Sequence, residues 1–281
     1  MKTIVLATVA ISLSMASFAQ KDTTGREKAD TIKVGGMIII KKAGKDTSRT
    51  HEVIINTKKK TKVSNPNIST NWWVVDLGFA NVTDNTNYST AQSQGFVGPG
   101  VGKDQMKLRT GKSINVNIWM FMQKLNLINH YVNLKYGLGA ELNNYRFENN
   151  DILFQKNPTR IILNNTSGDG NVEKNKLAAD YVTVPVMLNF NFTPHQKRNG
   201  FGFSAGVSGG YLYSSREKLK YADDHKNKIH SDFDLRKWKL SYIGELSLGP
   251  VRLYGSVASQ NMWEKGLDQT PYNIGIRFSH M

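Results

Sequence analysis

The sequence contains no cysteine and no apolar run long enough to cross a bilayer as a helix. The missing cysteine excludes lipid attachment through a cysteine at the mature N-terminus, although it says little about the redox compartment. Glycine and tyrosine are well represented, with 24 and 11 residues. Any membrane-spanning structure in this chain must therefore be built from strands.

Alternation of apolar and polar residues is the dominant pattern from Trp72 onward. In residues 132–142 every even-numbered position is apolar, and every odd-numbered position is polar or glycine. A period of two predicts a strand with one face of each kind. The polar set contains Lys135 and Glu141 beside glycines, which suits a tight polar interior better than an outer coat. The apolar face is therefore predicted to meet lipid.

Eight such stretches are predicted as strands, at about residues 72–80, 113–122, 130–147, 181–192, 201–213, 237–248, 251–257 and 272–279. The connections after the second, fourth and sixth are short, and the other loops are longer. This asymmetry is typical of outer-membrane barrels, with short turns in the periplasm and long loops outside. The predicted fold class is all-β: an eight-stranded antiparallel transmembrane β-barrel with an N-terminal periplasmic extension. A soluble lipocalin-like barrel would need the opposite polarity.

The first nineteen residues have the pattern of an export signal. Lys2 precedes an apolar stretch from Ile4 to Phe18, and small residues stand at positions 17 and 19, where a signal peptidase cuts. Residues 1–19 are therefore predicted to be a signal peptide, cleaved after Ala19. The alternative is a short buried helix.

Residues 20–70 form a basic extension before the predicted barrel domain at residues 71–281. They hold 12 basic and 5 acidic side chains of the 37 and 22 in the chain, whose net charge is +15. Strands at Ile32–Val34 and Met37–Ile40 around two glycines predict a small hairpin, with a possible third strand at Val53–Ile55. An exported chain without a recognition motif excludes nucleic acid as a partner. Attraction to lipid phosphates and simple solubility of a tail both remain open.

The last predicted strand carries a candidate assembly signal. Its order is a polar residue, any residue, glycine, an apolar residue, any residue and an apolar residue. The pattern residues are Asn273, Gly275, Ile276 and Phe278. This order is similar to the β-signal read by the barrel-assembly machinery, which becomes a predicted partner. Residues 279–281 extend beyond the aromatic residue, whereas many such proteins end there.

Residues 71–281 resemble the outer-membrane β-barrel domain of PorT-like proteins, a small barrel of the OmpX and OmpA kind. The resemblance rests on the Trp72–Phe79 opening, on Tyr181–Phe192 with its embedded Val184 and Pro185, and on the closing strand. It implies an eight-stranded barrel in the outer membrane. Because activities in this family are mostly undefined, the resemblance implies a location more than a role.

Alternation also predicts which charged side chains face the lumen. They are Asp76, Lys135, Glu141, Lys237, Lys239, Glu245, Arg252 and Arg277. Eight strands enclose only enough space for side chains, so opposite charges should pair and leave no pore. Glu245, Arg252 and Arg277 are predicted to form the tightest cluster, near the periplasmic strand ends. Pro185 removes a ladder donor, which predicts a bulge or kink at that position.

Catalytic and ligand-binding motifs are weak. Residues 206–210 match the hydrolase pattern G-x-S-x-G, but that motif needs a strand-to-helix turn and here it lies within a strand. Residues 223–230 offer two aspartates and two histidines without a recognised metal spacing. Glycines at 98–102 lack the phosphate-loop spacing and read as a flexible outer loop. We therefore expect no catalytic residue, no metal and no cofactor.

Three functions are compatible with these patterns. The first is an integral outer-membrane barrel that is structural or binds something at the surface through its long loops. The second is a secretion or envelope-assembly accessory that docks a periplasmic partner through residues 20–70. The third is a lipid A-modifying enzyme, although no set of serine, histidine and acid lies at one height. Outer-membrane lipid and lipopolysaccharide, the assembly machinery and a periplasmic or surface protein are the expected partners.

Overall fold

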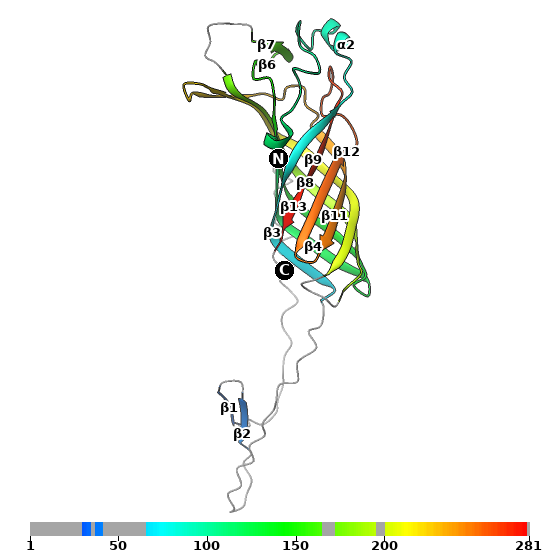
Figure 1. The fold of residues 1–281 in the computed structure, drawn as a ribbon. Helices are drawn as coiled ribbons and strands as arrows, with labels where there is room; N and C mark the ends of the chain where they lie inside the picture. The colour runs from blue at the N-terminus through cyan, green and yellow to red at the C-terminus, as the bar shows by residue number, and fades with distance from the viewer. Residues whose placement is uncertain (1–29, 35–36, 42–65, 165–171, 195–199, 280–281) are drawn as a thin grey trace, which may run out of the picture. The chain divides into compact units, whose positions relative to one another are not determined.

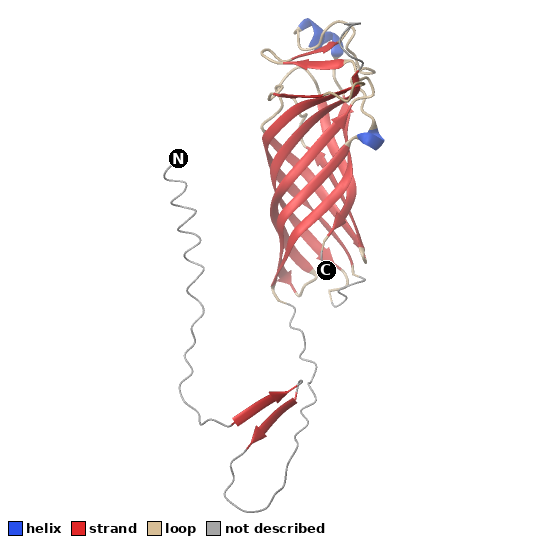
Figure 2. Ribbon diagram, turned by 90° about the vertical axis from the view of Figure 1, so that its left-hand side faces the viewer, coloured by secondary structure: helices blue, strands red, loops and turns tan. Residues whose placement is uncertain are grey.

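The computed structural model is built mainly of β-strands (Figures 1 and 2). It describes residues 30–34, 37–41, 66–164, 172–194 and 200–279. The chain divides into two compact units, residues 1–64 and residues 65–281. Within the described residues, no helix has the length and apolar character needed to span a membrane.

The N-terminal unit contains one antiparallel pair of strands, β1 (Asp30–Val34) and β2 (Met37–Lys41). Val34 lies opposite Met37, so the two strands have the register of a hairpin with a two-residue connection. The hairpin predicted at these positions is confirmed. The signal segment at 1–19 and the third strand at 53–55 lie outside the described residues.

The second unit is a closed ring of eight strands (Figure 1). The ring contains β3 (Ile68–Asp84), β4 (Ile114–Ile128), β5 (Val132–Arg146), β8 (Val172–Asn191), β9 (Phe201–Tyr221), β11 (Trp238–Leu248), β12 (Val251–Ala258) and β13 (Gln269–Phe278). Every neighbouring pair is antiparallel, and β13 pairs back onto β3. Closure leaves no open sheet edge, as a bilayer requires. The predicted eight-stranded antiparallel barrel is confirmed.

The polarity of the ring is inverted relative to a water-soluble barrel. On β3, Leu77 and Phe79 are about half exposed on the outside of the ring. Asp76, which precedes Leu77 on the same strand, is fully buried inside. Aromatic side chains gather on the outer face at both ends of the ring. Trp72, Trp73, Phe192 and Phe201 lie at the end with short turns, and Tyr211, Tyr213 and Trp238 lie at the end with long loops. Such girdles mark the two interfaces of a membrane.

The register departs from simple alternation at several places in the ring, one of them on β4. β4 contains an irregularity between Trp119 and Phe121, after which the faces exchange, so Met122 is buried inside, not lipid-facing as alternation predicted. Pro185 produces no bulge. The ladder of β8 with β5 has a gap at Pro185 but resumes in the same register, and the nearest shift on β8 lies between Asp180 and Tyr181. Of the bulge or kink predicted at Pro185, the bulge is therefore wrong, and the kink stays a prediction.

The long connections form a packed cap at one end of the ring, which we call the loop end (Figure 2). They contain α2 (Tyr88–Ser93), η1 (Thr110–Lys112), β6 (Ile152–Gln155), β7 (Arg160–Leu163) and β10 (Lys226–His230). Each connection contributes buried apolar residues to one cluster, among them Phe96, Val97, Leu108, Phe147, Ile152, Phe154, Ile161, Phe233, Leu235, Met262 and Trp263. Backbone bridges join the connections to one another.

The segment predicted as a flexible outer loop is part of this cap. Val97 and Val101, which flank its first glycines, are buried in the apolar cluster. The Gly98 amide donates to the Ile161 carbonyl at 2.7 Å, and the Ile161 amide donates to the Phe96 carbonyl at 2.9 Å. The segment is therefore fixed by β7, a neighbour that no motif in the sequence indicates.

Candidate functional site

Six charged side chains meet inside the barrel, and their charges balance. Three are acidic and three are basic, contributed by β3, β5, β11 and β13: Asp76, Glu141, Glu245, Lys135, Lys239 and Arg277. All six were predicted to face the lumen. Burying any one of them without a partner would cost several kcal/mol, so equal numbers of each sign are a condition for the closed interior.

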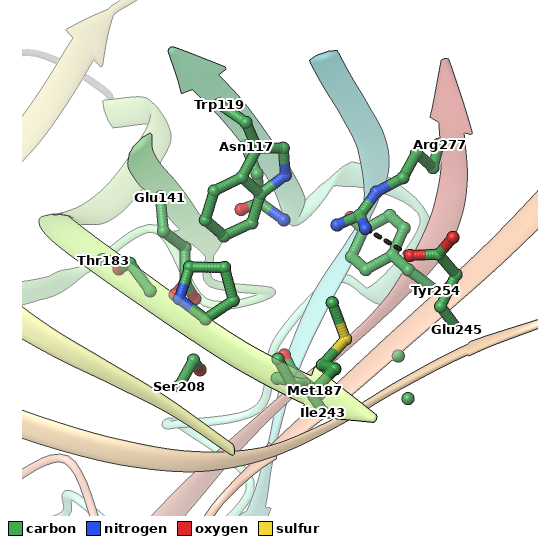
Figure 3. A pocket seen from close by; sticks show the side chains of 14 residues that line it. Asn117, Trp119, Glu141, Thr183, Met187, Ser208, Ile243, Glu245, Tyr254 and Arg277 are labelled. Carbon is green, nitrogen blue, oxygen red and sulfur yellow. Dashed lines mark hydrogen bonds and ion pairs between the residues drawn. The ribbon is translucent and has the colours of Figure 1, made fainter. Parts of the chain in front are cut away.

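Arg277 lies at the centre of this ionic network. Its guanidinium donates to Asp76 through Nε at 2.7 Å and through Nη2 at 2.8 Å, and Nη1 contacts Glu245 (Figure 3). Glu245 also accepts from Nζ of Lys135. The planar fork of arginine suits such a bidentate contact, which is stronger and more directional than a contact to one oxygen. Arg277 thus links β13 through side chains to β3, its neighbour in the sheet, and to β11, which lies one strand further round the ring, beyond β12.

A second ion pair lies beside the first cluster. Nζ of Lys239 is 2.5 Å from Oε1 of Glu141. The same oxygen accepts from the amide groups of Asn143 and Asn273, each at 3.1 Å. Lys239 also lies 4.4 Å from the ring centre of Tyr181, a cation–π distance. Glu141 is therefore saturated by donors from three strands.

Neutral donors complete the network around Asp76. Its Oδ2 accepts from Nε1 of Trp119 at 2.7 Å and from the Asn117 amide at 3.1 Å. Oη of Tyr254 donates to Oδ1 of the Asn115 side chain at 2.5 Å. None of these neutral residues was among the predicted members of the network, which were all charged. Trp119 and Tyr254 stand at positions of β4 and β12 that alternation turns inward, and this is the feature of the sequence that places them in the lumen.

Glycines on facing strands make room for these large side chains. A Cβ atom on Gly139 would lie 2.7 Å from the Trp119 ring, and one on Gly78 would lie 2.5 Å from Oη of Tyr254. Both distances are well below ordinary contact. The small and large inward residues therefore fit as complementary pairs, as expected in the taper of a small barrel.

Two predicted members do not join the network. Lys237 precedes β11 and is exposed at the loop-end rim, because the pairing of β11 with β9 begins only at Trp238 and Tyr211. Arg252 lies opposite Arg277 but is partly exposed near the turn end, where its Nη1 donates to Oγ of Ser279 at 2.5 Å. The predicted cluster of Glu245, Arg252 and Arg277 is thus correct for two residues and wrong for Arg252.

A cavity of about 30 Å³ remains beside the network (Figure 3). Its volume accommodates about two water molecules. Ser208 and Thr183 line it, and Oγ1 of Thr183 has no hydrogen-bond partner among the described residues. The lining includes Glu141 and Glu245 but no histidine, so the serine–histidine pair of a hydrolase is not formed among these residues. No three metal-ligating side chains converge in the described part of the chain.

The residues of the candidate assembly signal occupy both faces of β13. Asn273 is buried and donates to Glu141 and to Oγ of Ser256, at 3.1 and 3.2 Å. Gly275 is packed tightly against β3, where a Cβ would approach the Leu77 carbonyl to 2.3 Å. Ile276 and Phe278 are exposed on the outer face. The pattern therefore has a structural role in the finished barrel, and its recognition during assembly stays a prediction.

A buried carboxyl group in the cap escaped the sequence analysis. Glu217 lies on the part of β9 beyond the girdle and is completely inaccessible to solvent. It accepts from the Phe154 amide at 3.3 Å and from the Asn175 side chain at 3.2 Å. Burial raises the pKa of Glu217 to about 8, and the two hydrogen bonds only partly oppose this effect. Glu217 thus holds β6 against β9 in a site that favours a neutral carboxyl group.

Replacing Asp76 tests the balance of the network. We expect Asp76→Asn to destabilise the folded barrel by about 3–5 kcal/mol, because one positive charge would stay buried without its partner. Glu148→Gln is the matched control, since Glu148 forms a 3.2 Å pair with Lys107 in which both side chains are largely exposed. That change should cost less than about 1 kcal/mol. Urea unfolding in lipid vesicles measures both, and equal losses would contradict the proposed importance of burial.

Glu217 should make the stability of the folded chain depend on pH. Its pKa in the folded state, about 8, lies above the ordinary value of 4.5, so the protonated form is favoured by folding. The contribution of Glu217 to the free energy of unfolding is complete below pH 4.5. It is lost as the pH rises through 8, at up to about 1.4 kcal/mol per pH unit. Glu217→Gln should flatten the unfolding free energy between pH 5 and 9. An unchanged pH slope in this variant would refute the assignment.

Comparison with known proteins agrees with the geometry of the barrel. A family profile described as an outer membrane protein beta-barrel domain matches residues 73–257, which is about two thirds of the chain. No curated protein matches the sequence significantly. The profile covers most of the ring, from β3 to the end of β12, and the inverted polarity of that ring is what an outer-membrane location requires. The chain therefore belongs to the outer-membrane β-barrel family.

Proposed function

We propose that this chain is an outer-membrane barrel with a closed lumen, which acts as a structural anchor and presents a packed cap at the cell surface. The observation that carries the proposal is the balanced network of six buried charges. Each of the six has an oppositely charged partner within the network, unlike the unpaired charged groups that line a conducting pore.

The dimensions of the interior support a closed lumen. Eight strands enclose only enough space for side chains, and the cavity beside the network has room for about two waters. At the loop end, the apolar cluster of the cap covers the ring. An ion passing through would have to lose its hydration shell in the network and again in an apolar layer, and both steps are unfavourable.

The positions where the first strand begins and the last strand ends indicate how the barrel is oriented. β3 begins and β13 ends at the turn end, so an even number of strands returns the chain to the side on which it entered. In outer-membrane barrels that side is the periplasm. We propose that the turn end and the basic N-terminal extension lie in the periplasm, and that the cap lies outside.

One observation favours a second candidate, an envelope-assembly or secretion accessory. The hairpin of β1 and β2 has only two strands, and such a pair is marginally stable in isolation. Addition to the edge of a partner's sheet would satisfy its free backbone groups. A lipid-modifying activity receives no comparable support, and we propose a role without catalysis.

Conductance is the direct test of the closed lumen. Purified protein in a planar bilayer should show no steady current at physiological salt, because no continuous aqueous path crosses the network and the cap. A known porin inserted under the same conditions provides the positive control. A sustained, reproducible conductance from the refolded chain would rule out the closed-lumen proposal.

Cysteine labelling tests the orientation, and the absence of native cysteine makes each signal specific. We choose three single substitutions: Lys103→Cys in the cap, Pro250→Cys in a turn at the other end of the ring, and Thr31→Cys on β1. A membrane-impermeant maleimide should label only the first in intact cells and all three after the outer membrane is permeabilised. Labelling of Pro250→Cys in intact cells would reverse the orientation, and labelling of Thr31→Cys would place the N-terminal unit outside.

A further inference from the structure

Basic side chains stand directly opposite one another where the strands continue beyond the loop-end girdle. The pairing of β5, β8, β9 and β10 aligns them in two cross-strand rows. The first row contains Arg146, Lys176, Lys218 and Lys228. The second row, next to the first, contains Lys174, Lys220 and Lys226, and Arg216 on β9 adjoins the first row on its other side. We call these eight residues the basic lattice. Opposed residues in an antiparallel sheet share a face, so the eight side chains form one surface.

This surface is the continuation of the lipid-facing side of the barrel. On β8 the positions that alternate outward run from the exposed Val182 of the apolar belt through Asp180 and Ala178, whose side chains are covered, to the partly exposed Lys176 of the lattice. On β9 the lattice begins with Arg216, three residues after the exposed Tyr213 of the aromatic girdle. From Phe201 to Tyr213 the strand rises about 30 Å along the barrel axis at the usual spacing and tilt, close to the thickness of a hydrocarbon core. The lattice therefore lies at the height of the lipid head groups.

The lattice has few counter-charges of its own. Arg216 pairs with Asp180 at 2.5 Å, and Lys220 pairs with Glu173 at 3.1 Å and with Asp224 at 2.6 Å. The other six cations have no carboxylate partner among the residues that the structure describes. Nε of Arg146 is buried and has no hydrogen-bond partner in the same part of the chain.

The lattice residues repel one another, and this lowers the pKa of two of its lysines. The pKa of Lys176 is lowered by burial and then by Arg146 and Lys174, and the pKa of Lys218 is lowered by burial and then by Arg216. Like charges placed directly opposite destabilise a sheet. An arrangement that is unfavourable alone becomes favourable when an anion with several negative charges bridges the rows.

We propose that the basic lattice is a binding site for the phosphate groups of outer-leaflet lipid, with the acyl chains lying on the apolar belt below it. The lipid class that fits is a glycolipid with phosphates on its sugar head group, such as the lipid A part of lipopolysaccharide. Its phosphate groups would meet the basic lattice, and its acyl chains would meet the apolar belt on the same strands. The proposal rests on the proposed orientation, in which the loop end faces the outer leaflet.

The test is a titration of the detergent-solubilised full chain with lipid A carrying two phosphates, followed by native mass spectrometry. Wild type should bind this lipid more tightly than the same lipid without phosphates. Lys176→Gln with Lys218→Gln should weaken binding about fivefold for each charge, or about 25-fold together. Lys176→Arg with Lys218→Arg should keep the affinity. In detergent without lipid A the glutamine variant should unfold no earlier than wild type, because it relieves repulsion.

The matched control removes two charges from the same end of the molecule but away from the lattice. Lys103 and Lys156 are exposed residues of the cap, and Lys103→Gln with Lys156→Gln should change the affinity less than twofold. Equal binding of phosphorylated and dephosphorylated lipid, or an equal loss in both double variants, would overturn the proposal. Soluble polyphosphate that binds as tightly as lipid A would overturn the assignment to lipid. The cysteine labelling described above separates these failures from a reversed orientation.

Discussion

The balance of charge inside the ring is the constraint on which the rest of the structure depends. A narrow barrel in lipid turns apolar residues outward, so its interior must be filled by the other half of an alternating sequence. Asp76, Glu141 and Glu245 meet Lys135, Lys239 and Arg277, and all of these contacts except that of Arg277 with Glu245 join strands that are distant in the chain. Because desolvating one ion costs several kcal/mol, the six charges stabilise the ring only as a complete set. The glycines that face Trp119 and Tyr254 serve the same end, since they let the neutral donors reach the ions.

Alternation was sufficient to predict the strands, their number and most of the buried charges. It failed where the backbone departs from a period of two. Met120, Phe121 and Met122 are all apolar, so nothing in the sequence marks the irregularity that turns Met122 inward. Lys237 stands at a position that alternation would turn inward, but it lies just before the first residue of β11. Outside the strand, alternation no longer determines which way a side chain points. A proline was a reasonable sign of a bulge, yet Pro185 is accommodated by a gap in the ladder, without a shift in register.

The cap could not be predicted for a different reason. Its apolar residues are sparse and follow no period within any one loop, so each loop reads as polar and exposed. They become a core only when four connections converge, as in the bridges of Val97 with Ile161 and of Leu235 with Trp263. Long-range convergence of this kind is a property of the closed ring, which fixes where the eight strand ends lie. Glu217 was missed for the same reason, because its surroundings come from β6 and β8.

One irregularity in β9 links the cap to the outer surface. Tyr181 pairs with Leu212 and Asp180 with Ser214, so Tyr213 is an extra residue and the faces of β9 exchange beyond it. Before this bulge the even-numbered positions of β9 face inward; after it the odd-numbered positions do, which brings Glu217 and Leu219 into the cap. The same exchange turns Arg216, Lys218 and Lys220 outward. Without the extra residue, the lysines would point into an apolar core and Glu217 would point at the membrane surface. A single inserted residue therefore permits both a packed cap inside and a cationic surface outside.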